Sequence, residues 1–207
     1  MSPIVLHIPH ASKEIPKNVR STFLPSDEKI ERELLLMTDA WTDDIVARIA
    51  FDVTRVIFPV SRLVVDPERF SDDADEPMAA RGMGAVYTKL STGEPLRVLN
   101  HAERRKLMAT YYEPHHALLQ KAVAAALGQF GHCLIIDIHS FSSTPLPHEL
   151  DQSVGRPEIC IGFDPFHSPL NQTSDLKLVC GEHGFAAALN RPFNGSMVPS
   201  KYWNIDA

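Results

Sequence analysis

The sequence has few cysteines, no excess of basic residues and no long apolar run, and each shortage excludes a class of protein. Its three cysteines, Cys133, Cys160 and Cys180, show no Cys-x-x-Cys spacing, so we expect buried free thiols rather than a disulfide framework or zinc ribbon. Lys and Arg total 20 against 26 for Asp and Glu, and the net charge of −6 argues against a nucleic-acid partner. The longest apolar runs, such as 122–127, fall far short of the roughly 20 residues that span a bilayer, so we expect no membrane partner.

Signals of several other classes are also missing. Residues 1–7 enter an apolar run directly, without the basic region or cleavage site of a signal peptide, which predicts a cytoplasmic protein. There is no Gly-x-Ser-x-Gly elbow of a serine hydrolase, and Gly82 and Gly84 stand without the rest of a phosphate-binding glycine motif. With 207 residues, 44% of them hydrophobic, the chain suffices for one full core, and we expect a single domain over 1–207.

Short apolar runs alternate with amphipathic segments along the chain, a pattern typical of α/β proteins. Strands are expected at 4–8, 54–58, 63–65, 133–138, 158–163 and 186–190, and helices within 27–50, 101–127 and 170–183. Asp39 falls at a break between two helical pieces, Pro114 predicts a kink, and 67–95 reads as a long loop. We predict a three-layer α/β/α sandwich around a mixed, largely parallel sheet.

Histidine is the residue type that most suggests chemistry in this sequence. Ten histidines are present, and His10 and His139 each follow a predicted strand. Ligand sites in α/β sheets gather at the carboxyl ends of the strands. A catalytic zinc takes three ligands from histidines and carboxylates and leaves one position open, and either Glu14 or Asp39 can supply the carboxylate.

Six blocks of sequence, read together, resemble the N-formylglutamate amidohydrolase family. The blocks are PHASKEIP at 9–16, TDAWTD at 38–43, SRLVVDPER at 61–69, PHHAL at 114–118, DIHSF at 137–141 and NRPFNG at 190–195. The family is similar to the zinc metallocarboxypeptidases, whose domain is an α/β sandwich around a mixed sheet. The resemblance therefore implies a hydrolase-like domain of this fold over 1–207, and we expect it to lack its C-terminal segment.

The resemblance implies a metal site and a reaction. His10 and His139 correspond to metal ligands, Asp39 is the expected carboxylate ligand, and Glu14 is the alternative. Asp43 is expected to support the site or to cap a helix. The implied cofactor is one Zn²⁺ per chain, with another divalent metal as the alternative. The implied reaction is hydrolysis of N-formyl-L-glutamate, or a related N-acyl amino acid, in histidine degradation.

The resemblance also implies how the substrate is held. Guanidinium groups bind carboxylates bidentately, and Arg62, Arg69 and Arg191 match family positions, with Asn194 completing the last block. Glu68 departs from the family, which usually has Asn before the arginine of the middle block. His116 is either a packed helical histidine beside the proline or, if it faces the site, the residue expected to donate a proton or stabilise the oxyanion.

The general base is the part of the pattern that this chain does not match. The family's Gln-x-Glu block normally lies beyond the point where this chain stops, at 204–207. Three alternatives follow: a truncated chain, another base, or a catalytically impaired member. Besides the amidohydrolase, two further hypotheses are a carboxypeptidase-like hydrolase of another small amide or peptide and a non-catalytic metal- or ligand-binding protein. The sequence leaves the oligomeric state open.

Overall fold

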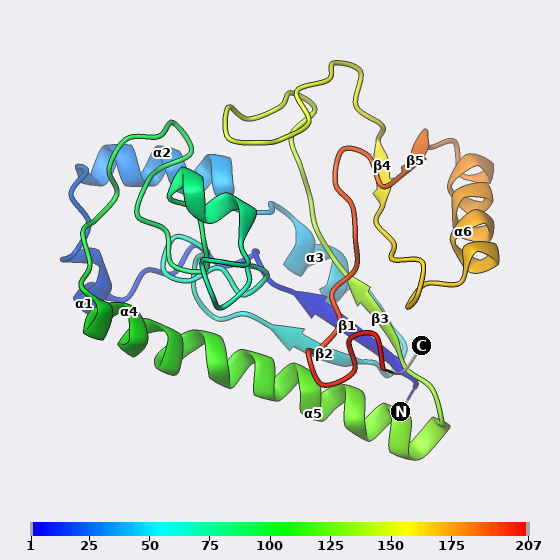
Figure 1. Cartoon of the computed structure of the whole chain (residues 1–207). Helices are drawn as coiled ribbons and strands as arrows, with labels where there is room; N and C mark the ends of the chain where they lie inside the picture. Colours follow the sequence, from blue (N-terminus) through cyan, green and yellow to red (C-terminus); the bar gives the residue numbers. More distant parts are fainter. Residues whose placement is uncertain (1, 206–207) are drawn as a thin grey trace. The chain divides into compact units, whose positions relative to one another are not determined.

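A three-stranded parallel sheet, in the order β2-β1-β3, organises the first part of the chain. The computed structural model, which describes residues 2–205, is drawn in Figure 1. β1 (Ile4–Ile8) lies between β2 (Thr54–Ile57) and β3 (Leu134–Asp137). A strand buried on both faces favours a nearly continuous apolar run such as IVLHI. The register pairs His7 with Asp137, so β1 and β3 end side by side at one edge.

Two helices cover the opposite faces of this sheet. Leu6 and Ile8 share a buried cluster with Val46 of α3 (Thr42–Ala47). His7 points to the other face, where it contacts His115 of α5 (Glu113–Phe130), the long helix that runs along the strands in Figure 1. Successive side chains of a strand point to opposite faces, so β1 is covered by one helix on each side.

The break predicted around Asp39 is confirmed. After the short helix α1 (Lys17–Arg20), α2 (Asp27–Met37) begins at Ser26, whose side chain accepts a hydrogen bond from the Lys29 N–H. α2 ends at Met37 and α3 begins at Thr42, so Asp39 lies in the connection.

The interruption expected near Pro114 is also confirmed. α4 (His101–Leu107) begins at a capping box formed by Asn100 and Glu103. It passes through a π-helical turn, η2 (Met108–Tyr112), into α5, whose first turn contains Pro114. Proline has no N–H to donate to the preceding turn, and a local change of hydrogen-bond pattern accommodates this loss.

The strand predicted at 63–65 is wrong. Leu63, Val64 and Val65 are fully buried, but Leu63 and Val64 lie in a turn, in which the Val64 N–H donates to the Ser61 carbonyl at 2.8 Å, and Val65 has no regular secondary structure. Apolar β-branched residues favour burial in a strand, but a buried loop segment satisfies the same preference. The expected long loop after it contains the 3₁₀ helix η1 (Pro77–Arg81) and is anchored by the fully buried Tyr87.

The chain divides into two compact units, Met1–Phe141 and Ser142–Ala207, and each is described by itself. The second unit pairs β4 (Ile159–Ile161) in parallel with β5 (Ala187–Leu189), and α6 (Leu170–Glu182) connects them. The strands and helix expected there are confirmed. That all of 1–207 forms one domain stays a prediction, and the chain end at 206–207 lies outside the described residues.

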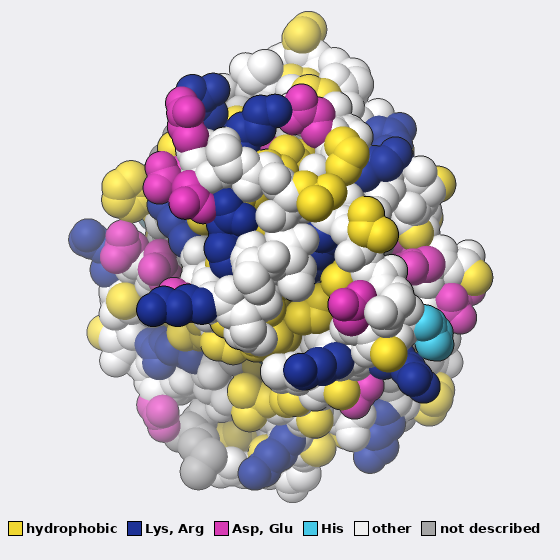
Figure 2. Space-filling model, turned by 90° about the vertical axis from the view of Figure 1, so that its left-hand side faces the viewer, with side chains coloured by type: hydrophobic (Ala, Val, Ile, Leu, Met, Phe, Trp, Pro, Cys, Tyr) yellow, Lys and Arg dark blue, Asp and Glu magenta, His cyan; other side chains and the backbone are white. Residues whose placement is uncertain are grey.

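The helices, the surface charges and the cysteines can be compared with the classes of protein that the sequence argued against. Among the described helices, none combines the length and apolar character needed to cross a membrane. On the face drawn in Figure 2, Lys and Arg side chains stand among Asp and Glu side chains rather than gathering in one basic field. The three cysteines are free thiols, as expected, but only Cys180 is buried; Cys133 and Cys160 are partly exposed.

Candidate metal centre

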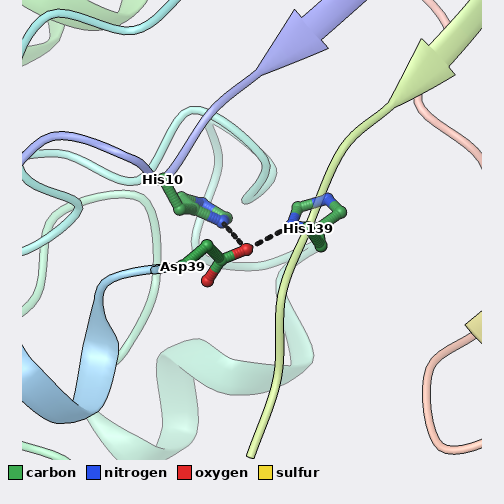
Figure 3. Close-up of side chains that lie close together, drawn as sticks. All are labelled: His10, Asp39 and His139. Atoms are coloured by element: carbon green, nitrogen blue, oxygen red, sulfur yellow. Dashed lines mark hydrogen bonds and ion pairs between the residues drawn. The ribbon is translucent and has the colours of Figure 1, made fainter. Parts of the chain in front are cut away.

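His10, Asp39 and His139 come together at the carboxyl ends of β1 and β3. Each histidine lies two residues beyond its strand, and Asp39 enters from the connection between α2 and α3. Figure 3 shows the three side chains pointing toward one another, with both histidines directed at the same Asp39 oxygen. His139 Nδ1 lies 2.8 Å and His10 Nδ1 3.8 Å from Asp39 Oδ2, and the three candidate ligand atoms lie within 4.8 Å of one another. These are the three residues expected as ligands.

A buried carboxylate sets the orientation of His10. His10 Nε2 lies 2.9 Å from Asp66 Oδ1, and an ionised carboxylate only accepts hydrogen bonds. In neutral His10, the proton is therefore on Nε2, and Nδ1 carries a lone pair. This Nδ1 atom is buried and makes no hydrogen bond; Glu68 Oε2 is 3.5 Å away. Burial, and then Arg62, oppose a proton on this atom, but Asp66, Glu68 and Asp39 together raise the pKa of His10.

His139 is surrounded by carboxylates. Its Nε2 atom lies 3.2 Å from both Glu68 Oε1 and Asp137 Oδ2, while Nδ1 faces Asp39. Burial opposes protonation of the ring, but Glu68, Asp137 and Asp39 outweigh it and hold the pKa of His139 well above its ordinary value. In the metal-free chain the ring is therefore an imidazolium that bridges these carboxylates. A metal ion on Nδ1 would replace one proton and leave the Nε2–H contacts in place.

The charges at the centre are strongly shifted by their neighbours. Burial alone raises the pKa of Asp39, but His10 and His139 lower it far more, and the carboxyl stays ionised. Burial likewise opposes ionisation of Asp66, yet Arg62 and His10 hold its pKa well below the usual range. For Glu68, burial and the nearby Asp137 raise the pKa.

Two of the predicted substrate-binding arginines are already paired within the first unit. Arg62 donates from Nη2 and Nε to Asp66 Oδ2 at 2.7 and 3.1 Å, and its Nη1 lies 3.8 Å from Asp39 Oδ1. Arg69 lies 3.6 Å from Asp66 and 3.7 Å from Glu76, and its buried Nε makes no hydrogen bond. Arg62 thus belongs to the support of the centre, and Arg69 forms longer ion pairs with the same Asp66 carboxylate and with Glu76.

The other predicted site residues lie elsewhere. Glu14 is exposed and belongs to neither group of candidate ligands among the described residues. Asp43 accepts a hydrogen bond from the Asp44 N–H inside the first turn of α3, but the N-cap residue is Trp41 and no side chain caps the helix, so only the supporting role of Asp43 stays a prediction. His116 Nε2 lies 2.8 Å from the Pro67 carbonyl oxygen, and its ring packs on Tyr112. Arg191 and Asn194 are exposed residues of the second unit, and their role in substrate binding stays a prediction.

The sequence interpretation missed the carboxylates and the histidine behind the centre. His7, Glu68 and Asp137 form a second group whose ligand atoms lie within 4.8 Å of one another. The signal for two of them is the pairing of β1 with β3, which places His7 beside Asp137. That register follows from the fold rather than from local sequence. Glu68 was visible only as a departure from the family pattern.

Histidines and carboxylates gather at the carboxyl ends of parallel strands. The chain is therefore an α/β protein with a candidate metal-binding site at one edge of its sheet. The chain belongs to the N-formylglutamate amidohydrolase family, whose sequence model matches residues 2–207. The resemblance carried by the six blocks is therefore confirmed. The family places the chain among hydrolases of amide bonds.

Solved structures agree on the fold. An N-formylglutamate amidohydrolase from Ralstonia eutropha superposes with a TM-score of 0.78 at 22% identity, covering 93% of this chain and 73% of the other. A gene product from Agrobacterium tumefaciens gives a TM-score of 0.68 at 20% identity, covering 93% and 70%. No curated protein matches the sequence. The predicted α/β fold with a parallel central sheet is confirmed.

Proposed function

We propose that the chain hydrolyses the amide bond of N-formyl-L-glutamate or a related N-acyl amino acid, releasing the free amino acid and formate or another carboxylate. The observation that carries this proposal is the cluster of His10, Asp39 and His139 in a member of an amidohydrolase family. The substrate is accordingly a small molecule. Its place in histidine degradation and the cytoplasmic location stay predictions.

We propose that His10, Asp39 and His139 hold one Zn²⁺ or another divalent metal. The residues fit such an ion: two imidazoles and a carboxylate are a common catalytic zinc set, and the buried His10 Nδ1 makes no hydrogen bond. When bound, zinc polarises an acyl carbonyl and lowers the pKa of water toward about 7. Asp66 and Asp137 would orient the two imidazoles from behind.

The arginines of the site serve different parts of the proposed reaction. Arg62 keeps the buried Asp66 ionised and thereby holds His10 in place. Arg69, whose ion pairs with Asp66 and Glu76 are longer than those of Arg62, is the candidate in the first unit for the substrate carboxylate. Arg191 and Asn194 are proposed as further substrate contacts on the strength of the NRPFNG block alone.

Amide hydrolysis moves a proton from the attacking water to the departing nitrogen, so the site needs a group that holds this proton in between. Of the alternatives raised by the sequence, a base other than the family's glutamate is supported by Glu68. Its carboxylate lies beside both histidines, 3.5 Å from His10 Nδ1 and 3.2 Å from His139 Nε2. His116 stays a proposed proton donor, and the Pro67 carbonyl fixes its ring.

The test combines metal content with product release. Purified protein is analysed for bound metal and assayed for formate release from N-formyl-L-glutamate, before and after chelation. We expect about one zinc per chain, loss of activity on chelation, and loss of both metal and activity in His139→Ala. His132→Ala is the matched control, because His132 is an exposed histidine at the opposite end of β3.

The same assay separates the alternative functions. Turnover of acyl dipeptides without formate release would favour the carboxypeptidase-like hydrolase. Metal binding without hydrolysis of any of these amides would favour the non-catalytic member. A wild-type chain that binds no divalent metal would contradict the proposed centre.

A further inference from the structure

His7 and His115 lie outside the proposed ligand set but connect to it in one line of polar contacts. His115 Nε2 lies 2.8 Å from His7 Nε2, and His7 Nδ1 lies 2.8 Å from Asp137 Oδ1. The other oxygen of Asp137, Oδ2, lies 3.2 Å from His139 Nε2. The line therefore runs from α5 through the adjacent strands β1 and β3 to a proposed ligand.

One arrangement of protons satisfies every contact in this line. The ionised Asp137 only accepts, so His7 donates from Nδ1 and its Nε2 carries a lone pair. That lone pair requires an N–H donor, which is His115 Nε2. Burial, and then the neighbouring His7 and His116, lower the pKa of His115 to about 3, so its ring is neutral and able to play this part at pH 7.

We propose that His7 and His115 are positioning residues for the metal centre. They fix Asp137 so that it accepts from His139 Nε2–H and keeps His139 Nδ1 directed toward Asp39 and His10. The inference rests on the metal centre of the proposed function. It explains why a strand otherwise made of apolar residues carries a completely buried histidine one residue before its end.

Glu68 is an alternative hydrogen-bond acceptor for His139, which is why the position of Asp137 needs to be fixed. Glu68 Oε1 also lies 3.2 Å from His139 Nε2, so two carboxylates compete for one N–H. Glu68 and Asp137 are each 20% exposed, whereas His7 is fully buried. The fully buried His7 thereby favours Asp137 over Glu68 as the acceptor of the His139 Nε2–H.

A second metal ion is a less satisfactory account of the same residues. His7, Glu68 and Asp137 bring ligand atoms within 4.8 Å of one another. However, both ring nitrogens of His7 already have a partner at 2.8 Å, Asp137 Oδ1 and His115 Nε2, whereas His10 Nδ1 in the first group makes no hydrogen bond. A titration that gives two ions per chain, with the second lost in a His7 variant, would overturn the proposal.

The main experiment measures divalent metal affinity in the full chain. Zn²⁺ binding is followed by calorimetry, and Co²⁺ binding by its absorption spectrum, which reports ligand geometry. His7→Leu removes both ring contacts and should weaken binding about 10- to 100-fold, the range for removing a hydrogen-bond partner of a metal ligand. His7→Asn, whose amide can donate from nearly the position of Nδ1, should bind within a few-fold of wild type and keep its Co²⁺ spectrum.

A second pair of variants guards against misfolding of the His7→Leu chain. His115 lines a cavity formed also by Ile57, Pro59, Thr110, Tyr111, Pro114 and Leu118. His115→Leu should weaken metal binding severalfold, and His115→Gln, which keeps a donor for His7, should restore it. Leu118→Ala alters the same cavity without touching the line and should leave affinity unchanged.

The outcomes distinguish the positioning role of His7 and His115 from the proposed metal centre on which it rests. Undiminished binding in both Leu variants, with one ion per chain in wild type, overturns the positioning role and leaves the proposed centre standing. No metal binding by wild type overturns both. Weak binding in the Leu variants, with recovery in Asn and Gln, supports the line from His115 to His139.

Discussion

Asp66 shows how a single residue holds the centre together. It is fully buried and accepts from His10 Nε2 at 2.9 Å, from Arg62 and from the Tyr87 hydroxyl at 2.6 Å. Its position thus determines the direction of His10, which the sequence places at the strand end. Asp66 lies 56 residues after His10 in the sequence, so no local pattern identifies Asp66 as the partner of His10.

Replacing Asp66 should destabilise the fold as well as the site. Asp66→Asn keeps the side-chain volume but leaves the Arg62 charge without its carboxylate, and breaking a buried pair costs about 3–5 kcal/mol. Chemical denaturation measures this loss. Glu94→Gln is the control: its pair with Lys29 is half exposed and should contribute less than about 1 kcal/mol. A loss below 1 kcal/mol in Asp66→Asn would contradict the buried-pair account.

His115 should make stability depend on pH. Burial lowers its pKa to about 3, below the ordinary 6.5, so between these values the unfolded chain binds a proton that the folded chain excludes. Its contribution is therefore fully present above about pH 6.5 and is lost as the pH falls toward 3. Between pH 7 and 5, wild type should lose about 2 kcal/mol more than His115→Gln. Denaturation curves at both pH values test this, and equal losses would contradict it.

At the scale of elements, the sequence predicted most boundaries that local chemistry determines. The break at Asp39 and the interruption before Pro114 are both confirmed, although the N-cap residue of α3 is Trp41 rather than Asp39. The strand at 63–65 is wrong, because burial alone does not distinguish a strand from an anchored turn. The pairing of His7 with Asp137 depends on which strands become neighbours, and this is decided only by the whole sheet.

The capping box of α4 permits a test at this scale. The Asn100 side chain accepts from the Glu103 N–H at 3.0 Å, and Glu103 returns the contact to the Asn100 N–H at 2.8 Å. Asn100→Ala should lower the free energy of unfolding by about 1 kcal/mol, whereas Asn100→Asp should retain most of it. Denaturant titration of the three proteins measures the difference. Equal stability of wild type and Asn100→Ala would show that the cap does not stabilise α4.

At the scale of the whole molecule, the proposed ligands are confined to one of the two units. His10, Asp39 and His139 all fall within Met1–Phe141. A ligand that binds only the folded state stabilises what it binds, so metal should act first on this unit. The residues that the sequence assigns to substrate from the second unit, Arg191 and Asn194, are not among the proposed metal ligands.

Hydrogen exchange followed by mass spectrometry tests this division. Zn²⁺ at about 100 times its Kd adds about 2.7 kcal/mol, so amides of β1 and β3 that exchange through opening of the first unit should exchange about 100-fold more slowly. Amides of β4 and β5 should keep their metal-free rates, because their unit contains none of the three ligands. His139→Ala should abolish the protection. Equal protection of both units would show that they open as one, and protection of neither would contradict the metal centre at the ends of β1 and β3.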